Sequence, residues 1–171
     1  MKGTGSPWLN LFDVLEVTGG RLWDPMPEGN GPYFSGCAID SRALESGELF
    51  VPLPGTRADG HDFIAAALKG KAGGTLVKAG RSPTAEWPRV GKPVIEVRDP
   101  LAALQAIGRS CRDRASIPVV AVTGSNGKTT TKEMVAAVLG TARKVHKNVG
   151  NLNNHIVENN VSLADIRLPA I

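Results

Sequence analysis

Cysteine and histidine are scarce in this chain of 171 residues. Its two cysteines, Cys37 and Cys111, lie far apart, and neither has a second cysteine at metal-ligand spacing. The three histidines, His61, His146 and His155, lack that spacing as well. The pattern therefore favours buried free thiols over a disulfide, and it gives no sign of a zinc centre.

Long apolar runs are also missing. No stretch of about 18 apolar residues occurs, so we expect no membrane span. The first seven residues contain one lysine followed by turn-forming residues, and they lack the apolar core of a secretory signal. We therefore expect a cytoplasmic protein.

An excess of one charge sign is absent too. Lysine and arginine number 20 against 16 aspartates and glutamates, a net charge of +4, and residues 109–114 show acids mixed among the bases. Such mixing is typical of a solvated helix face and not of a nucleic-acid surface. A mildly basic chain still suits an anionic small-molecule substrate.

Helix and strand patterns alternate along the chain, which predicts an α/β fold. Helices are expected at residues 8–17 (Ser6 as N-cap, Pro7 in the first turn), 61–69, 99–114 and 128–139. Strands are expected at residues 33–39, 48–53, 74–78, 94–97 and 118–122. In the last helix, we expect Met134, Val135, Val138 and Leu139 to form a buried stripe.

A break near Asp99 divides the chain into two expected units. Residues 1–98 should form a small α/β domain. Residues 99–171 should begin a parallel nucleotide-binding sheet, with residues 119–122 as a central strand, because the run at 118–122 is continuously apolar.

The most informative stretch is a glycine turn between an expected strand and an expected helix. Gly124 and Gly127 let the backbone curve so that several N–H groups face one anion, and the following helix N-terminus adds partial positive charge. Lys128 can then reach the β- and γ-phosphates of a nucleotide, while the Thr129 hydroxyl can bind Mg²⁺. The residues proposed for nucleotide binding are Gly124, Ser125, Asn126, Gly127, Lys128, Thr129 and Thr130.

This loop departs from the usual phosphate-loop pattern, because Val122 stands where the first glycine is expected. The competing interpretation is that Lys128 only caps the turn before the helix. The strand before the loop and the helix after it favour phosphate binding.

Three ordered motifs together resemble the Mur ligase family. Residues 123–131, Thr-Gly-Ser-Asn-Gly-Lys-Thr-Thr-Thr, are similar to that family's ATP-binding loop. Asp40-Ser41-Arg42, residues 47–51, Gly55 and residues 59–63 resemble its N-terminal uridine-nucleotide domain. Residues 150–154, Gly-Asn-Leu-Asn-Asn, resemble a motif of the members that add a terminal dipeptide.

The resemblance implies a substrate site as well. Ile39 and Ser41 would lie against the uridine nucleotide, and Asn151 and Asn154 would also contact substrate. The loop formed by Thr56, Arg57 and Ala58 would contact the other side of the nucleotide, where an arginine suits a diphosphate. Simpler roles stay open for Ser41 and for residues near it. Ser41 could be a strand-end cap, Arg42 could serve a structural ion pair, and Phe50 and Phe63 are expected in the core.

The activity implied by the resemblance is ATP-dependent amide-bond formation in peptidoglycan precursor synthesis. ATP, with Mg²⁺, would phosphorylate the terminal carboxylate of UDP-N-acetylmuramoyl-tripeptide, and D-alanyl-D-alanine would attack the acyl phosphate. Lys128 and Thr129 would be the catalytic residues, and the protein would be a monomer. Phosphoryl transfer depends mainly on positioning and charge neutralisation, which suits these two side chains.

In the family, further metal ligands and a C-terminal domain follow the third motif, so we expect this chain alone to be inactive as a ligase. After that motif the sequence also departs from the family pattern, at residues 157–160. Two alternatives stay open: the tripeptide-forming ligase of the same family, and a non-catalytic module that binds a UDP-sugar or ATP.

Overall fold

The computed structural model describes residues 9–25, 31–55, 58–81, 91–115, 118–145 and 147. Its first elements are β1 (Leu9–Asn10), α1 (Leu11–Thr18), β2 (Arg21–Leu22), β3 (Tyr33–Phe34), β4 (Cys37–Ala38) and β5 (Leu49–Phe50). They are followed by the 3-10 helix η1 (Gly60–Phe63), α2 (Ile64–Lys69), β6 (Gly74–Lys78), β7 (Val94–Val97), α3 (Pro100–Ala115) and α4 (Lys128–Gly140).

The main sheet has five strands in the order β2-β7-β6-β5-β4. β4, β5, β6 and β7 run parallel, while β2 pairs with β7 in the antiparallel direction. β1 and β3 form a separate antiparallel pair. The predicted α/β class is confirmed.

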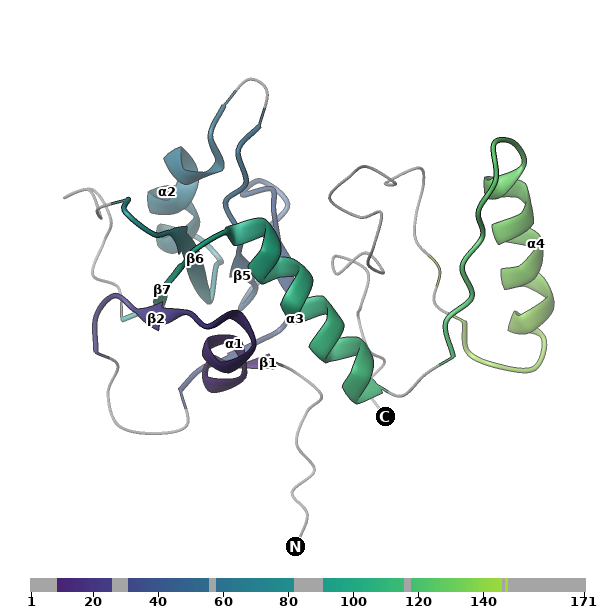
Figure 1. Ribbon diagram of the computed structural model, residues 1–171, viewed down its shortest axis with the longest axis horizontal. Helices are drawn as coiled ribbons and strands as arrows, with labels where there is room; N and C mark the ends of the chain where they lie inside the picture. Colours follow the sequence, from purple (N-terminus) through teal and green to yellow (C-terminus); the bar gives the residue numbers. More distant parts are fainter. Residues whose placement is uncertain are drawn as a thin grey trace, which may run out of the picture.

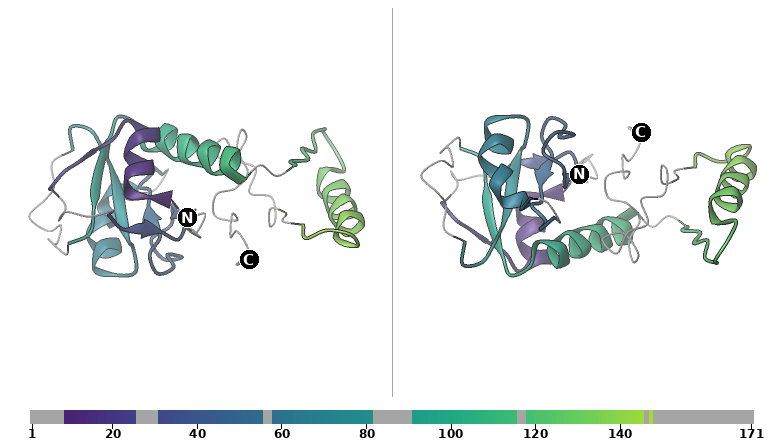
Figure 2. Two further views of the ribbon diagram at one scale, coloured as in Figure 1. Left: turned by 90° about the horizontal axis from the view of Figure 1, so that it is seen from below. Right: turned by 90° about the horizontal axis from the view of Figure 1, so that it is seen from above.

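Helices cover both faces of this sheet (Figures 1 and 2). α1 and α3 lie on one face, over a core that includes Leu11, Val14, Leu76, Ile95 and Ile107. α2 lies on the opposite face, over a second core of Leu44, Phe50, Ile64, Ala67, Leu68, Ala72 and Val77. Burying apolar side chains on both faces is what a mostly parallel sheet requires.

Helix α1 begins later than predicted. Its N-cap is Asn10, whose side chain accepts from the Asp13 backbone N–H at 2.8 Å, while the Asp13 carboxylate accepts from the Asn10 N–H at 3.2 Å. This reciprocal capping box replaces the predicted cap, Ser6, which lies outside the described residues. Gly19 ends the helix with φ 61°, a left-handed conformation that glycine adopts without strain.

Two predicted strands are shorter than expected. The strand predicted at residues 33–39 is two strands, β3 and β4, which belong to different sheets. The strand predicted at 48–53 is paired only at Leu49–Phe50. β6 and β7 match the predicted ranges 74–78 and 94–97. The helix predicted at 61–69 begins with the 3-10 turn η1 and ends at Lys69.

Helix α3 shares its core with the sheet that precedes it. Ala103, Leu104 and Ile107 are buried in the same apolar cluster as Leu9 and Val14. In the predicted division of the chain, α3 belonged to the second unit, which began at Asp99. Its apolar stripe could not reveal which sheet it covers, because an amphipathic helix can pack on either neighbour.

The segment before α4 is not a strand, contrary to the prediction for residues 118–122. Val119 and Val120 are 51% and 61% exposed. A strand needs a neighbour for its backbone hydrogen bonds, and none of the described strands pairs with this segment.

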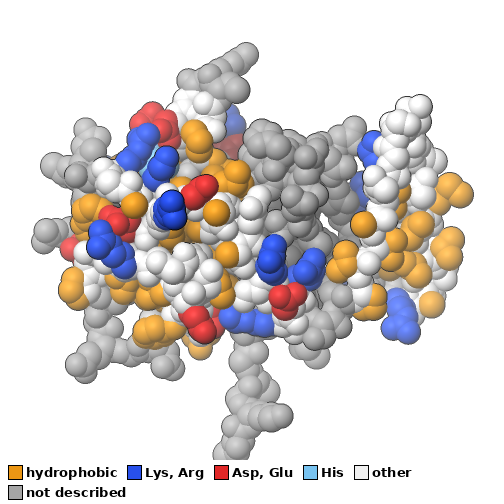
Figure 3. Space-filling model, viewed as in Figure 1, with side chains coloured by type: hydrophobic (Ala, Val, Ile, Leu, Met, Phe, Trp, Pro, Cys, Tyr) orange, Lys and Arg blue, Asp and Glu red, His pale blue; other side chains and the backbone are white. Residues whose placement is uncertain are grey.

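The predicted buried stripe on α4 is also wrong for the described structure. Met134, Val138 and Leu139 are 64%, 70% and 41% exposed, and only Val135 is half-buried. α4 lies apart from the sheet in each view, and hydrophobic side chains gather on its surface in Figure 3. The apolar pattern is the one predicted, but in the described residues nothing covers it.

No helix in the described part of the chain is long and apolar enough to cross a membrane.

Candidate functional site

The glycine turn before α4 has the backbone conformation that the sequence predicted. Gly124 has φ 141° and Gly127 has φ 74°, both in the region that favours glycine. A Cβ atom built on Gly127 would find no heavy atom within 4 Å. Backbone conformation, and not crowding, therefore requires glycine there, and the space above the turn is open to a ligand.

Helix α4 starts directly from this turn, with Gly127 as its N-cap and no side chain capping it. The Thr131 N–H donates to the Gly127 carbonyl at 2.9 Å, which closes the first helical turn. The N–H groups that open a helix have no intrahelical acceptor and carry partial positive charge. The turn is exposed from Gly124 to Gly127, so these groups face a surface that an anion can approach.

Lys128 reaches back over the turn. Its ammonium group donates a hydrogen bond to the Gly124 carbonyl, while the residue as a whole is half-buried. This contact is the one that the capping interpretation predicts. It also places a full positive charge across the loop, where a phosphate would lie.

The neighbouring Thr129 and Thr130 are exposed at the start of α4. Within the described residues, no group of three or more His, Cys, Asp or Glu side chains is placed to hold a metal ion. Mg²⁺ is commonly bound by few protein ligands together with nucleotide phosphates. A single Thr129 hydroxyl therefore fits a metal that arrives with a nucleotide, not a resident metal.

The middle of α4 carries a contact that sequence reasoning missed. The Glu133 carboxylate accepts a hydrogen bond from Lys147, and it also lies 3.5 Å from the Lys132 ammonium. The hydrogen bond from Lys147 lowers the pKa of Glu133. The pair ties the chain that follows α4 back to the helix. A separation of 14 residues gave no local sequence signal for it.

The candidate uridine-nucleotide residues lie at the carboxyl end of the main sheet. Ile39 and Ser41 directly follow β4, and Ile39 is 45% exposed although its neighbours in the strand are largely covered. Ala58 is exposed in the connection that follows β5. Ligands of open parallel sheets bind at the carboxyl ends of the strands. Thr56, Arg57, Asn151 and Asn154 lie outside the described residues.

Arg42 forms a structural ion pair, which is the simpler of its two expected roles. Its Nε donates to Asp40 Oδ1 at 2.9 Å, and a terminal guanidinium nitrogen donates to Oδ2 at 2.7 Å. The Arg42 backbone N–H also donates to Oδ1, at 3.0 Å. These hydrogen bonds lower the pKa of Asp40 to about 2. The two residues that flank Ser41 are therefore hydrogen-bonded to each other, which fixes the turn that carries Ser41.

The two phenylalanines assigned to the core differ. Phe50 is 1% exposed and lies under α2, as predicted, whereas Phe63 is 42% exposed. Phe63 is the last residue of η1, where the chain passes from a 3-10 turn into α2 and its apolar periodicity shifts. The core prediction is therefore wrong for Phe63.

Asp59 and His61 form a second polar cluster at the same edge of the sheet. Asp59 Oδ1 lies 2.8 Å from His61 Nδ1, and the other carboxylate oxygen pairs with Arg81. The hydrogen bond from the His61 backbone N–H is the main cause that lowers the pKa of Asp59. Sequence reasoning used these residues only as part of a motif and assigned them no role.

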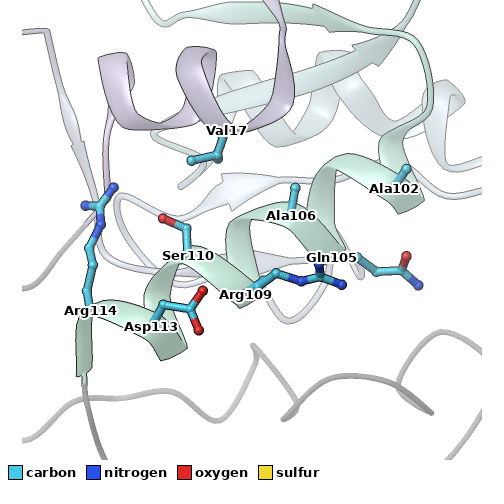
Figure 4. Close-up of a pocket in the computed structure, with 8 residues that line it drawn as sticks. All are labelled: Val17, Ala102, Gln105, Ala106, Arg109, Ser110, Asp113 and Arg114. Atoms are coloured by element: carbon cyan, nitrogen blue, oxygen red, sulfur yellow. The ribbon is translucent and has the colours of Figure 1, made fainter.

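A groove of about 740 Å³ lies elsewhere, between α1 and α3 (Figure 4). It is lined by Val17, Ala102, Gln105, Ala106, Arg109, Ser110, Asp113 and Arg114. None of the candidate site residues lines it. The structure thus offers two candidate regions, the glycine turn before α4 and the carboxyl end of the sheet.

Two family models match the chain, and both describe Mur ligases. The Mur ligase family catalytic domain matches residues 33–112, and the Mur ligase middle domain matches residues 122–167. The first match includes the carboxyl end of the sheet and most of α3, and the second begins just before the glycine turn.

Curated relatives carry the name UDP-N-acetylmuramoyl-tripeptide–D-alanyl-D-alanine ligase. The protein from Bacillus subtilis is 44% identical over 144 residues, covering 84% of this chain and 30% of its own length. The one from Escherichia coli is 39% identical over 148 residues, covering 86% of this chain and 30% of its own length. The chain thus spans about a third of the length of these relatives.

Solved structures agree with the sequence matches. A crystal structure of MurF from Acinetobacter baumannii aligns with a TM-score of 0.71 and 31% identity, over 87% of this chain and 32% of that one. MurF ligase from Thermotoga maritima in complex with ADP aligns with a TM-score of 0.58 and 33% identity, over 69% of this chain and 26% of that one. With the fold, the glycine turn and both family models in agreement, this chain belongs to the Mur ligase family.

Proposed function

We propose that this chain contributes the UDP-substrate site and the phosphate loop of a ligase that joins D-alanyl-D-alanine to UDP-N-acetylmuramoyl-tripeptide. The observation that carries the proposal is the exposed turn from Gly124 to Gly127, which opens directly into α4 and is crossed by the Lys128 ammonium group. The names of the relatives from Bacillus subtilis and Escherichia coli supply the two substrates.

The proposed division of labour follows the packing. Residues up to the end of α3 would bind the UDP-linked substrate, because α3 completes the core of the first sheet. The segment from residue 118 onward would bind ATP. We therefore propose a boundary after α3, in place of the boundary at residues 98–99 that the sequence break suggested.

In the proposed nucleotide site, backbone N–H groups of Gly124, Ser125, Asn126 and Gly127 surround the phosphates. Lys128 turns its ammonium group from the Gly124 carbonyl to the β- and γ-phosphates, and Thr130 lies in the first turn of α4 beside them. The Thr129 hydroxyl would hold Mg²⁺ together with the phosphates, and the metal supplies neutralisation of the charge that develops during phosphoryl transfer. Positioning the phosphates is thus the work of this loop.

In the proposed substrate site, Ile39 offers an exposed apolar side chain and Ser41 a hydroxyl to the uridine nucleotide. Ala58 would lie on its other side, with Thr56 and Arg57, and Asn151 and Asn154 would contact the substrate from the third motif. The peptide carboxylate would become an acyl phosphate before the amine of D-alanyl-D-alanine attacks it. We further propose a cytoplasmic, monomeric protein.

Calorimetric titration of the 171-residue chain tests this proposal. We expect UDP-N-acetylmuramoyl-tripeptide and ATP to bind independently, and UDP to compete only with the first. Ser41→Ala should weaken binding of the UDP compound, while Ser46→Ala, an exposed serine in the next turn, should not. Absence of binding by both ligands would refute the proposal. Tighter binding of UDP-N-acetylmuramoyl-dipeptide would favour the tripeptide-forming ligase instead.

A further inference from the structure

The side chain of Asp59 connects three chain segments at the carboxyl end of the sheet. Asp59 ends a narrow hairpin in which it bridges to Pro54, and the Gly55 N–H donates to the Ala58 carbonyl at 3.0 Å. η1 follows directly, and Arg81 approaches from the residues after β6.

The chain leaving this hairpin packs closely against the residues that follow β5. The Gly60 N–H donates to the Leu53 carbonyl at 3.0 Å. A Cβ atom on Gly60 would come within 2.6 Å of the Leu53 backbone nitrogen, so only glycine fits. The backbone on the carboxyl side of Asp59 is therefore fixed, and the position of the hairpin depends on what holds the Asp59 side chain.

Both oxygens of the Asp59 carboxylate are used. Oδ1 accepts the His61 backbone N–H at 3.0 Å, which caps η1, and it also lies 2.8 Å from His61 Nδ1. Oδ2 accepts a hydrogen bond from the Arg81 guanidinium. Asp59 is thus hydrogen-bonded to His61 and Arg81, which lie 2 and 22 positions further along the chain.

The imidazole of His61 carries the connection further into the fold. The side chain is 4% exposed, and its Nε2 accepts the Lys78 backbone N–H at 3.2 Å. Since Nε2 accepts, the ring proton is on Nδ1 and is donated to Asp59. A continuous chain of hydrogen bonds therefore runs from the last residue of β6 through His61 to Asp59.

This chain ends beside a proposed substrate contact. Ala58 precedes Asp59 directly, and Ile39 and Ser41 follow β4 at the same edge, because β4, β5 and β6 are adjacent and parallel. Arg81 is 46% exposed, so its ion pair adds little to global stability. The pair with Arg81 therefore acts mainly on the local position of the hairpin.

We infer that Asp59 is a positioning residue for the UDP-linked substrate: bonded to His61 and Arg81, it holds Ala58 and the hairpin base in the binding geometry at the carboxyl edge of the sheet. The inference rests on the proposed function. A supporting residue of this kind sets affinity without touching the ligand, because a contact displaced from its geometry loses its contribution.

Calorimetry on the 171-residue chain with UDP-N-acetylmuramoyl-tripeptide tests the role. We expect Asp59→Ala to raise the dissociation constant about 10-fold, which is the upper end of what one hydrogen bond displaced from its geometry contributes. Asp59→Asn keeps an acceptor oxygen for the His61 N–H, so its effect should be smaller. Asp62→Asn is the matched control, because it removes the same charge from an exposed position in η1.

A thermal melt and an ATP titration of each variant separate positioning from general loss of structure. Weaker UDP-substrate binding only in the Asp59 variants, with unchanged ATP affinity and with melting still above the temperature of the titration, would support the inference. Wild-type affinity in Asp59→Ala would overturn it, as would a loss fully explained by unfolding of both variants. A wild-type chain that does not bind the UDP compound would instead remove the proposed substrate site itself, and the inference with it.

Discussion

Replacing Lys128 by alanine separates phosphate binding from turn capping. In the structure the Lys128 ammonium group donates to the Gly124 carbonyl, across an exposed turn. If the turn binds ATP, the substitution removes a charge that faces the β- and γ-phosphates. If the lysine only caps the turn, the substitution removes one solvent-accessible hydrogen bond and leaves ATP affinity unchanged.

The expected magnitudes differ enough to be measured. A charge-assisted hydrogen bond to phosphate is worth roughly 1.5–3 kcal/mol, or about 10- to 100-fold in the dissociation constant. Folding should change by no more than about 0.5 kcal/mol, because the ammonium group and its acceptor lie on an exposed turn. Binding and stability should therefore separate clearly in this variant.

The assay is calorimetric titration with Mg-ATP, accompanied by a thermal melt. Lys144→Ala provides the matched control, since it removes the same charge from an exposed lysine beyond the opposite end of α4. The helix of 13 residues separates the two lysines by about 20 Å. Equal ATP affinity of wild type, Lys128→Ala and Lys144→Ala in folded proteins would end the phosphate-loop assignment.

Three further outcomes follow from the geometry. Gly127→Ala should destabilise the turn by about 1–2 kcal/mol, because φ is 74° there. Gly140→Ala is the contrasting variant: it lies in open space at the end of α4, so the alanine should raise the helicity measured by circular dichroism. Asp13→Ala should cost about 1–2 kcal/mol in urea unfolding at pH 7, by loss of the capping box and of the ion pair to α3. The pKa of Asp13 in the folded chain is lowered, chiefly by the hydrogen bond that it accepts from Arg114 in α3. Its contribution to the free energy of unfolding is therefore complete above the ordinary carboxyl pKa near 4, and it is lost as pH falls through the folded value. If the stability of Asp13→Ala fell as steeply with pH in that window as the stability of wild type, this account would be wrong. Burial raises the pKa of the Cys37 thiol, so iodoacetamide should leave it unmodified in the native chain and alkylate it in urea; rapid native labelling of Cys37 would disprove its burial.

Local sequence was sufficient where an element depends on its own residues. β6 and β7 have the predicted bounds, because short apolar runs between turn residues specify buried strands. The glycine turn is equally local: positive φ at Gly124 and Gly127 requires glycine, and α4 begins where the pattern predicted. The ion pair of Arg42 with Asp40 spans two residues and was within reach of sequence reasoning.

Errors arose where an element depends on its neighbours. The run at residues 118–122 has a strand's composition, yet none of the described strands pairs with it, and four of its five residues are exposed. The apolar residues of α4 were identified correctly, but their burial was not, since burial requires a second surface. Helix α3 had two possible partners, and only packing assigns it to the first sheet.

The sequence by itself determined the α/β class, the glycine turn before α4 and the family, because each depends on patterns and motifs of residues that are close together in the chain. Tertiary structure decided that β2 adds an antiparallel edge to the sheet, that Arg114 reaches Asp13 across 101 residues, and that Arg81 meets Asp59. Such contacts join segments whose separation carries no periodic signal. They form only when burial of the apolar faces of the sheet brings these segments together.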